Sequence, residues 1–186
     1  MSLDSKPHPP SKNNSAIDGE LPRNDDGRKL KIIIACSQFP PMKSGYARHA
    51  YELAKGFSDA GHDVHLVTED QGCSRIGKVS YLTKDGKSVF DKGCDIVQII
   101  GPSPLFSEQC VNYALKRGLK VVYAICAMPG LSSFYYNPIS PVVDWMYEKF
   151  RLKRTIKKID LAIFNTEDYA SSCSFFSGPY AVIPHG

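Results

Sequence analysis

The segment from Lys31 to Asp70 limits the possible fold more than any other part of this 186-residue sequence. It begins with a continuous apolar run, Lys31–Cys36, which is typical of a strand covered on both faces of a sheet. A Pro-rich loop leads into a helix over about 45–60, where apolar residues recur at intervals of three and four. Gly61 fits the end of that helix, and a second strand follows over 63–68. In such βαβ units, phosphorylated ligands bind where the strand turns into the helix.

The rest of the sequence continues this alternation. Short apolar runs predict strands, and the segments between them predict helices. The predicted strands are 78–82, 95–100, 119–126, 160–164 and 181–183, and the predicted helices are 107–117, 141–158 and 168–176. Strands and helices alternate about six times, which indicates an α/β fold with a mostly parallel sheet and helices on both faces. The loops that follow the strands should meet at the carboxyl edge of that sheet.

Composition excludes several classes of protein. The hydrophobic fraction of 42% is enough for an ordinary core, and the net charge of +4 is too small to indicate nucleic-acid binding. No apolar run reaches the length of about 18 residues that a membrane-spanning helix needs. The polar, Pro-rich residues 1–28 predict a disordered leader before a folded domain over 29–186.

The cysteines show neither the paired spacing of a metal site nor a disulfide framework. They are Cys36, Cys73, Cys94, Cys110, Cys126 and Cys173. Several lie in apolar runs, where a free cysteine behaves as a small hydrophobic residue. Reduced thiols in a cytoplasmic protein without a metal are the expectation.

The turn after the first strand lacks the sequence of a dinucleotide-binding Rossmann fold. That fold expects G-x-G-x-x-G, whereas the turn here carries 37–41 (SQFPP) and has Gly45 alone near the helix start. Pro40 and Pro41 also lack the N–H donors that would hold a pyrophosphate. The order Lys43-Ser44-Gly45 does not match a P-loop either. These observations argue against a nicotinamide-dependent oxidoreductase and against a P-loop nucleotide-binding site.

Five sequence segments occur together in a familiar order. They are FPPMKSGYARHAYELAKGFSDAGHDVHLVT, DIVQIIGPS, KVVYAICAMPGL, AIFNTEDYA and AVIPHG. In this order and spacing, residues 31–186 resemble the N-terminal domain of the GT-B glycosyltransferases, in particular the GT4-like group (glycosyl transferase group 1). The resemblance implies a Rossmann-like, acceptor-side domain. It also implies that a C-terminal donor-binding domain, absent from this sequence, or a separate chain completes the enzyme.

The function implied by the resemblance is sugar transfer of the hexosyltransferase kind. A nucleotide-sugar would be the donor substrate, a lipid-linked, glycan or small-molecule acceptor would receive the sugar, and no tightly bound cofactor is expected. The chain would be inactive without its donor-binding half. The alternative is a non-catalytic Rossmann-like binding or scaffold module.

The resemblance places substrate-binding residues in the first loop, at Lys43, Ser44, Gly45 and Tyr46. Gly45 would let the backbone approach a ligand closely, and Lys43 would add a mobile cation for a phosphate at the helix start. Tyr46 stands where many relatives have a second glycine, which narrows the space. A plain turn between strand and helix is the alternative.

Further candidates follow the later strands. Cys126 stands where many relatives have a histidine, and a thiol cannot replace an imidazole in orienting a sugar hydroxyl. Altered catalysis, an inactive homologue, misaligned loops and a buried structural cysteine remain open, so no catalytic residue is assigned. Met128 and Glu167 are the other substrate-binding candidates, although Glu167 equally suits a helix cap. His185 and Gly186 match a hinge between two domains.

Basic residues are concentrated over 148–158, within the last predicted long helix. Such a surface attracts anionic lipid headgroups, so the predicted location is cytoplasmic with attachment at the membrane periphery as an option. A helix face exposed to solvent is the alternative.

Overall fold

The computed structural model describes residues 28–41, 43–69, 78–79, 87–101, 104–125, 153–173 and 176–184. Its strands are β1 (Lys31–Cys36), β2 (Asp63–Val67), β3 (Lys78–Val79), β4 (Ile96–Ile100), β5 (Lys120–Ile125), β6 (Leu161–Phe164) and β7 (Tyr180–Val182). Its helices are α1 (Gly45–Asp59), α2 (Lys87–Asp91), α3 (Pro104–Lys116), α5 (Lys153–Ile156) and α6 (Glu167–Ser172).

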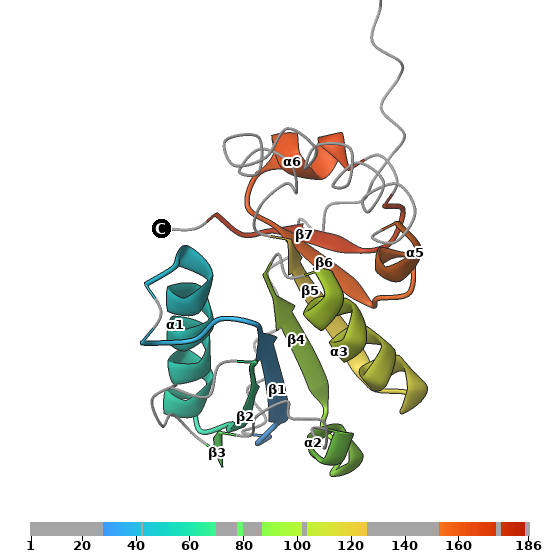
Figure 1. Ribbon diagram of the computed structural model, residues 1–186. Coiled ribbons are helices and arrows are strands. Elements are labelled where there is room, and N and C mark those ends of the chain that lie inside the picture. The colour runs from blue at the N-terminus through green and yellow to red at the C-terminus, as the bar shows by residue number, and fades with distance from the viewer. Residues whose placement is uncertain are drawn as a thin grey trace, which may run out of the picture.

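The strands form one seven-stranded sheet in the order β3-β2-β1-β4-β5-β6-β7 (Figure 1). Every neighbouring pair is parallel, so all carboxyl ends lie at the same edge. The predicted α/β class is therefore confirmed, and the fold is Rossmann-like. The chain order reverses between β1 and β4, because β2 lies on one side of β1 and β4 on the other.

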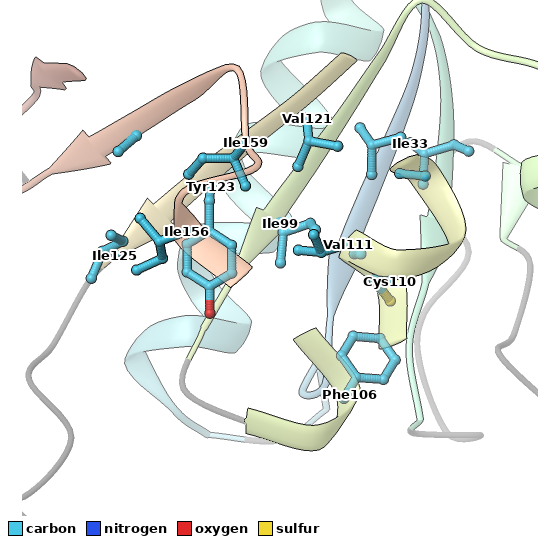
Figure 2. Close-up of a cluster of buried hydrophobic side chains, with 14 of the residues drawn as sticks. Ile33, Ile99, Phe106, Cys110, Val111, Val121, Tyr123, Ile125, Ile156 and Ile159 are labelled. Atoms are coloured by element: carbon cyan, nitrogen blue, oxygen red, sulfur yellow. The ribbon is translucent and has the colours of Figure 1, made fainter. Parts of the chain in front are cut away.

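Helices pack on both faces of this sheet, as the continuous apolar strands require. Along β1, Ile32, Ile34 and Cys36 belong to the core cluster that includes α1, while Ile33 and Ala35 belong to the cluster under α3 and α5. Figure 2 shows the second cluster, with residues of α3 facing the apolar side chains of β4 and β5. Both core layers are therefore encoded by alternate residues of the same strand.

Helix α1 has the sequence features that its position demands. The Ser44 side chain accepts a hydrogen bond from the Ala47 N–H at 3.0 Å and caps the first turn. Ala47, Ala50 and Ala54 are fully buried, and their small side chains let the helix lie close against the sheet. Gly61 has a positive φ of 87° just beyond the helix end, as the sequence predicted.

Helix α2 was not predicted, and its short sequence explains why. Five residues cannot form a stable helix alone, so the segment depends on tertiary contacts. Phe90 is buried, and the centroid of its ring lies 5.9 Å from the ring centroid of Tyr113 on α3. The Arg117 guanidinium forms an ion pair with the Asp91 carboxylate. The long helix predicted over 141–158 is described only from residue 153 onward, as α5.

Candidate functional site

The end of β1 and the end of β4 lie side by side at the carboxyl edge. Cys36 is aligned with Ile100 in the parallel register, so the loops that begin at Ser37 and Gly101 start next to each other. The chain leaves β1 toward α1 on one face of the sheet and leaves β4 toward α3 on the opposite face. In open α/β sheets the crevice for ligands forms at such a reversal.

Gly101 is held in one orientation at this edge of the sheet. Its φ of 109° is accessible to glycine and is strained for other residues. Its carbonyl oxygen accepts hydrogen bonds from the Tyr123 hydroxyl at 3.3 Å and from the Ser107 hydroxyl at 3.4 Å. Tyr123 and Ser107 are both buried, so neither hydroxyl can exchange this partner for bulk water without a cost.

Tyr46, in the first turn of α1, reaches across to Gly101. A Cβ built on Gly101 would lie 3.7 Å from Cδ1 of the Tyr46 ring and 3.9 Å from the Cys36 sulfur. The Cys36 thiol also donates to the Tyr46 carbonyl, with 3.9 Å between sulfur and oxygen. Tyr46 therefore joins the start of α1 to the end of β4.

At the start of α1, the Ser44 side chain already has a hydrogen-bond partner, whereas Lys43 and Gly45 are exposed to solvent. Ser44 uses its hydroxyl oxygen to cap the helix, so its predicted ligand contact would have to come from the other lone pair or from the proton. Lys43 is exposed. Gly45 is exposed too, and a Cβ placed on it would meet no atom within 4 Å. Neither packing nor a positive φ explains a glycine at this position.

The end of β2 is tied to the same loop. The Thr68 hydroxyl donates to the Ser37 carbonyl at 3.3 Å, and Thr68 is buried. Glu69 follows and is exposed. Burial raises the pKa of the Cys36 thiol to about 11, and a hydrogen bond from the Gln38 N–H lowers it by less. Cys36 is therefore protonated near neutral pH and acts as a hydrogen-bond donor rather than as a nucleophile.

Of the other predicted site residues, Glu167 lies in the described part of the chain. Glu167 is exposed at the start of α6, where Thr166 is the cap and accepts a hydrogen bond from the Tyr169 N–H at 3.2 Å. Glu167 thus occupies a favourable position for an acid at a helix N-terminus. The remaining candidates, Cys126, Met128, His185 and Gly186, lie outside the described residues.

The basic segment is described over 153–158. Arg154, Lys157 and Lys158 are exposed, whereas Ile156 is fully buried in the core. Ile159, next along the chain, is buried as well. These two apolar side chains are buried inside the protein and cannot insert into a membrane. In this part of the segment, only the basic side chains are available to a membrane surface.

Two kinds of feature are absent from the described residues. These residues contain no group of three or more histidine, cysteine, aspartate and glutamate side chains that could hold a metal ion. No helix in the described ranges is long and apolar enough to cross a bilayer. The cysteines in those ranges, Cys36, Cys94, Cys110 and Cys173, are free thiols.

The sequence did not predict that Gly101, Ser107 and Tyr123 belong to the candidate site at the carboxyl edge. One signal was present, because Tyr123 interrupts an otherwise aliphatic buried strand and a buried phenol usually has a hydrogen-bond partner. The identity of that partner, a carbonyl of the neighbouring loop, follows only from the pairing of β4 with β5.

No family model matches the chain, and no curated protein matches it. Among solved structures, the chain is similar to the Kef CTD of Shewanella denitrificans in its AMP-bound form. The identity is 17%, the TM-score is 0.42, and the match covers 76% of this chain and 74% of that chain. The predicted membership of the GT-B, GT4-like glycosyltransferases is wrong: no family model of that group matches the chain, and this solved structure is described as a Kef CTD. The short motifs that suggested it fit strand–loop–helix units of Rossmann-like folds more generally.

Proposed function

We propose that this chain is a non-catalytic Rossmann-like module that binds a small phosphorylated molecule at the carboxyl edge between β1 and β4. The reversal of chain order there supports a ligand crevice at this place. The first turn of α1 supports a phosphate in particular, because the N–H groups of a helix start and the partial positive charge favour anions. Lys43, which is exposed beside that turn, supplies a mobile cation.

The observation that carries the proposal is Gly45. No described neighbour requires a glycine at the first position of α1, because a Cβ there would meet no atom within 4 Å. The bare backbone of Gly45 leaves open space at the helix start, which is what a phosphate needs for close approach to the N–H groups. Gly56 in the same helix is equally exposed and equally open, but lies far from the carboxyl edge.

Sugar transfer stays a prediction from the sequence. A binding role needs neither a general base nor a donor-binding half, and the one thiol described at this edge, Cys36, is protonated at neutral pH. A reducing compartment such as the cytoplasm is part of the proposal, supported by the free thiols in the described ranges. Membrane attachment through 148–158 would rest on charge and would weaken with salt.

The proposed phosphate site is tested by comparing substitutions of Gly45, at the helix start, and of Gly56, which serves as the control. Isothermal titration with AMP and with glucose 6-phosphate is carried out on the wild type, on Gly45→Ala and on Gly56→Ala. Both variants should be as stable as the wild type or slightly more stable, by up to about 1 kcal/mol, because alanine favours a helix. Gly45→Ala should weaken binding about tenfold or more, since its methyl group stands where the phosphate approaches.

Gly56→Ala should leave binding unchanged. Equal affinity in all three proteins would remove Gly45 from the site. The absence of binding to every phosphorylated probe in the wild type would overturn the proposed function itself.

A further inference from the structure

We infer that the outer side of β7 is an interface at which two copies of this chain pair antiparallel and join their sheets into one. β7 is the last strand on its side of the sheet, so within the described residues it pairs with β6 alone (Figure 1). This surface is separated from the end of β4 by β5 and β6, and the inference does not depend on the proposed phosphate site.

The pairing with β6 shows which backbone groups of β7 point outward. The Ile183 N–H donates to the Phe164 carbonyl at 2.8 Å, so the backbone of Ile183 faces β6. Successive residues of a strand direct their N–H and C=O groups to opposite sides, so those of Tyr180 and Val182 point away from β6. No described residue bonds these four outward groups. They form the kind of unpaired strand edge that a further strand can join.

The outward groups of one β7 complement those of a second β7. When two copies run antiparallel about a two-fold axis beside Ala181, Tyr180 of each copy lies opposite Val182 of the other. Each of the two pairs exchanges two hydrogen bonds, so all four outward groups of both strands gain a partner. A two-fold interface requires a surface that complements itself, and this strand meets that requirement because its outward groups are placed symmetrically about Ala181.

The side chains of the strand also favour a second copy as the partner. The run 177–184 (SGPYAVIP) carries no charge, so antiparallel pairing brings no like charges together. Ala181 presents a small side chain at the axis. Ile183 lies on the same face as Ala181, and it is the large hydrophobic side chain that is exposed among the described residues, at 48%. Pairing beside it would remove part of this apolar surface from water.

The opposite side of the sheet is protected against such pairing. There the outer strand, β3, has two residues, and one of them is Lys78. Short length and lysine side chains are devices by which proteins keep outer strands from associating. β7 has neither a charge nor a proline at its three positions. Self-pairing is therefore assigned to β7 rather than to β3.

Sedimentation equilibrium of the full chain, over about a hundredfold range of concentration, tests this interface. The apparent mass of the wild type should rise from that of one chain to that of two. Val182→Pro should weaken the dimer at least about tenfold, because each copy loses an outward N–H donor. The fold should tolerate this proline, since that N–H makes no bond within the sheet. Val182→Ala is the matched control: it also shortens the side chain but keeps the N–H, and it should dimerise like the wild type.

Opposite charges at Ala181 test the antiparallel register. Ala181→Lys and Ala181→Glu should each be monomeric, because two like charges would meet beside the axis. An equimolar mixture of the two variants should form a mixed dimer, in which opposite charges meet instead. Urea denaturation checks that each variant is folded.

A wild type that stays monomeric over the whole range would overturn the inference and would leave the proposed function intact. A dimer that persists at full strength in folded Val182→Pro would overturn it as well, because the interface would then lie elsewhere. Failure of the two charged variants to associate when mixed would contradict the antiparallel pairing about Ala181.

Discussion

The two edges of the sheet fix the ends of its strands with opposite kinds of side chain. At the amino edge, carboxylates accept from the N–H groups that begin two strands: Asp95 binds the Lys31 N–H at 2.8 Å, and Asp160 binds the Val121 N–H at 2.9 Å. His62 likewise accepts from the Leu30 N–H through Nδ1 at 3.4 Å.

At the carboxyl edge, hydroxyl groups donate to the carbonyl groups of the loops that follow the strands. The hydroxyls of Thr68, Ser107 and Tyr123 all bind carbonyl oxygens. In both places a side chain satisfies a backbone group that the strand ladder leaves without a partner. The comparison teaches that charged acceptors hold the strand starts at the amino edge, whereas neutral hydroxyl groups hold the carboxyl edge, donating to loop carbonyls and, at Ser44, accepting from a helix N–H.

Gly101→Val should have the largest effect and should damage the carboxyl edge alone. A β-branched residue is strained at a φ of 109°, and its side chain would meet the Tyr46 ring and the Cys36 sulfur. We expect a loss of about 2–4 kcal/mol in the free energy of unfolding, measured by urea denaturation, and loss of phosphate binding. Full stability in this variant would show that the Gly101 backbone is free to rearrange.

Asp95→Ala should have the next largest effect and should damage only the amino edge. Removing the carboxylate leaves the Lys31 N–H without this partner and also removes the ion pair with Arg28. The expected loss in the free energy of unfolding is about 1–3 kcal/mol. Asp95→Asn should lose less, because an amide oxygen still accepts. Ligand affinity should not change in either variant, and a change would contradict the separation of the two edges.

Tyr123→Phe should have a smaller effect, because the Gly101 carbonyl keeps its bond from Ser107. We expect a loss of about 0.5–1.5 kcal/mol by urea denaturation. Adding Ser107→Ala should cost more than the sum of the two single changes, since only the double variant leaves the buried carbonyl with neither hydroxyl. Strict additivity would mean that the two hydroxyls act independently.

The pH dependence of stability should reveal Asp160 at the amino edge. Its partial burial raises the pKa, but hydrogen bonds from the Val121 N–H and the Lys120 ammonium outweigh burial and hold the pKa below the ordinary 3.8. A carboxyl group with a lowered pKa stabilises the folded state above its unfolded pKa and loses that contribution as the pH falls through the folded pKa.

Asp160→Asn should therefore lower stability at pH 6 and flatten the decline below about pH 4, as followed by denaturation at a series of pH values. The Tyr123→Phe variant, which changes the other edge, should keep the wild-type slope. An unchanged slope in Asp160→Asn would assign the acid sensitivity to other carboxyl groups.

Local sequence was enough to predict most of the elements. The run Lys31–Cys36 was predicted with the observed bounds, because its continuous apolar residues after Lys31 are typical of a strand covered on both faces. Helix α1 was predicted to within one residue at its end, since the apolar period and Gly61 act locally. Helix α2 was missed, because its five residues are helical only through contacts with α3.

The sequence by itself determined the α/β class and the parallel sheet, and it predicted a ligand site at the turn before α1. These follow from apolar periodicity and from backbone rules that act within a few residues. Tertiary structure decided the strand order, and with it the meeting of Tyr46 with Gly101 and the binding of the Gly101 carbonyl by two distant hydroxyls. Such contacts join residues far apart in the chain, and no local pattern encodes which strand ends become neighbours.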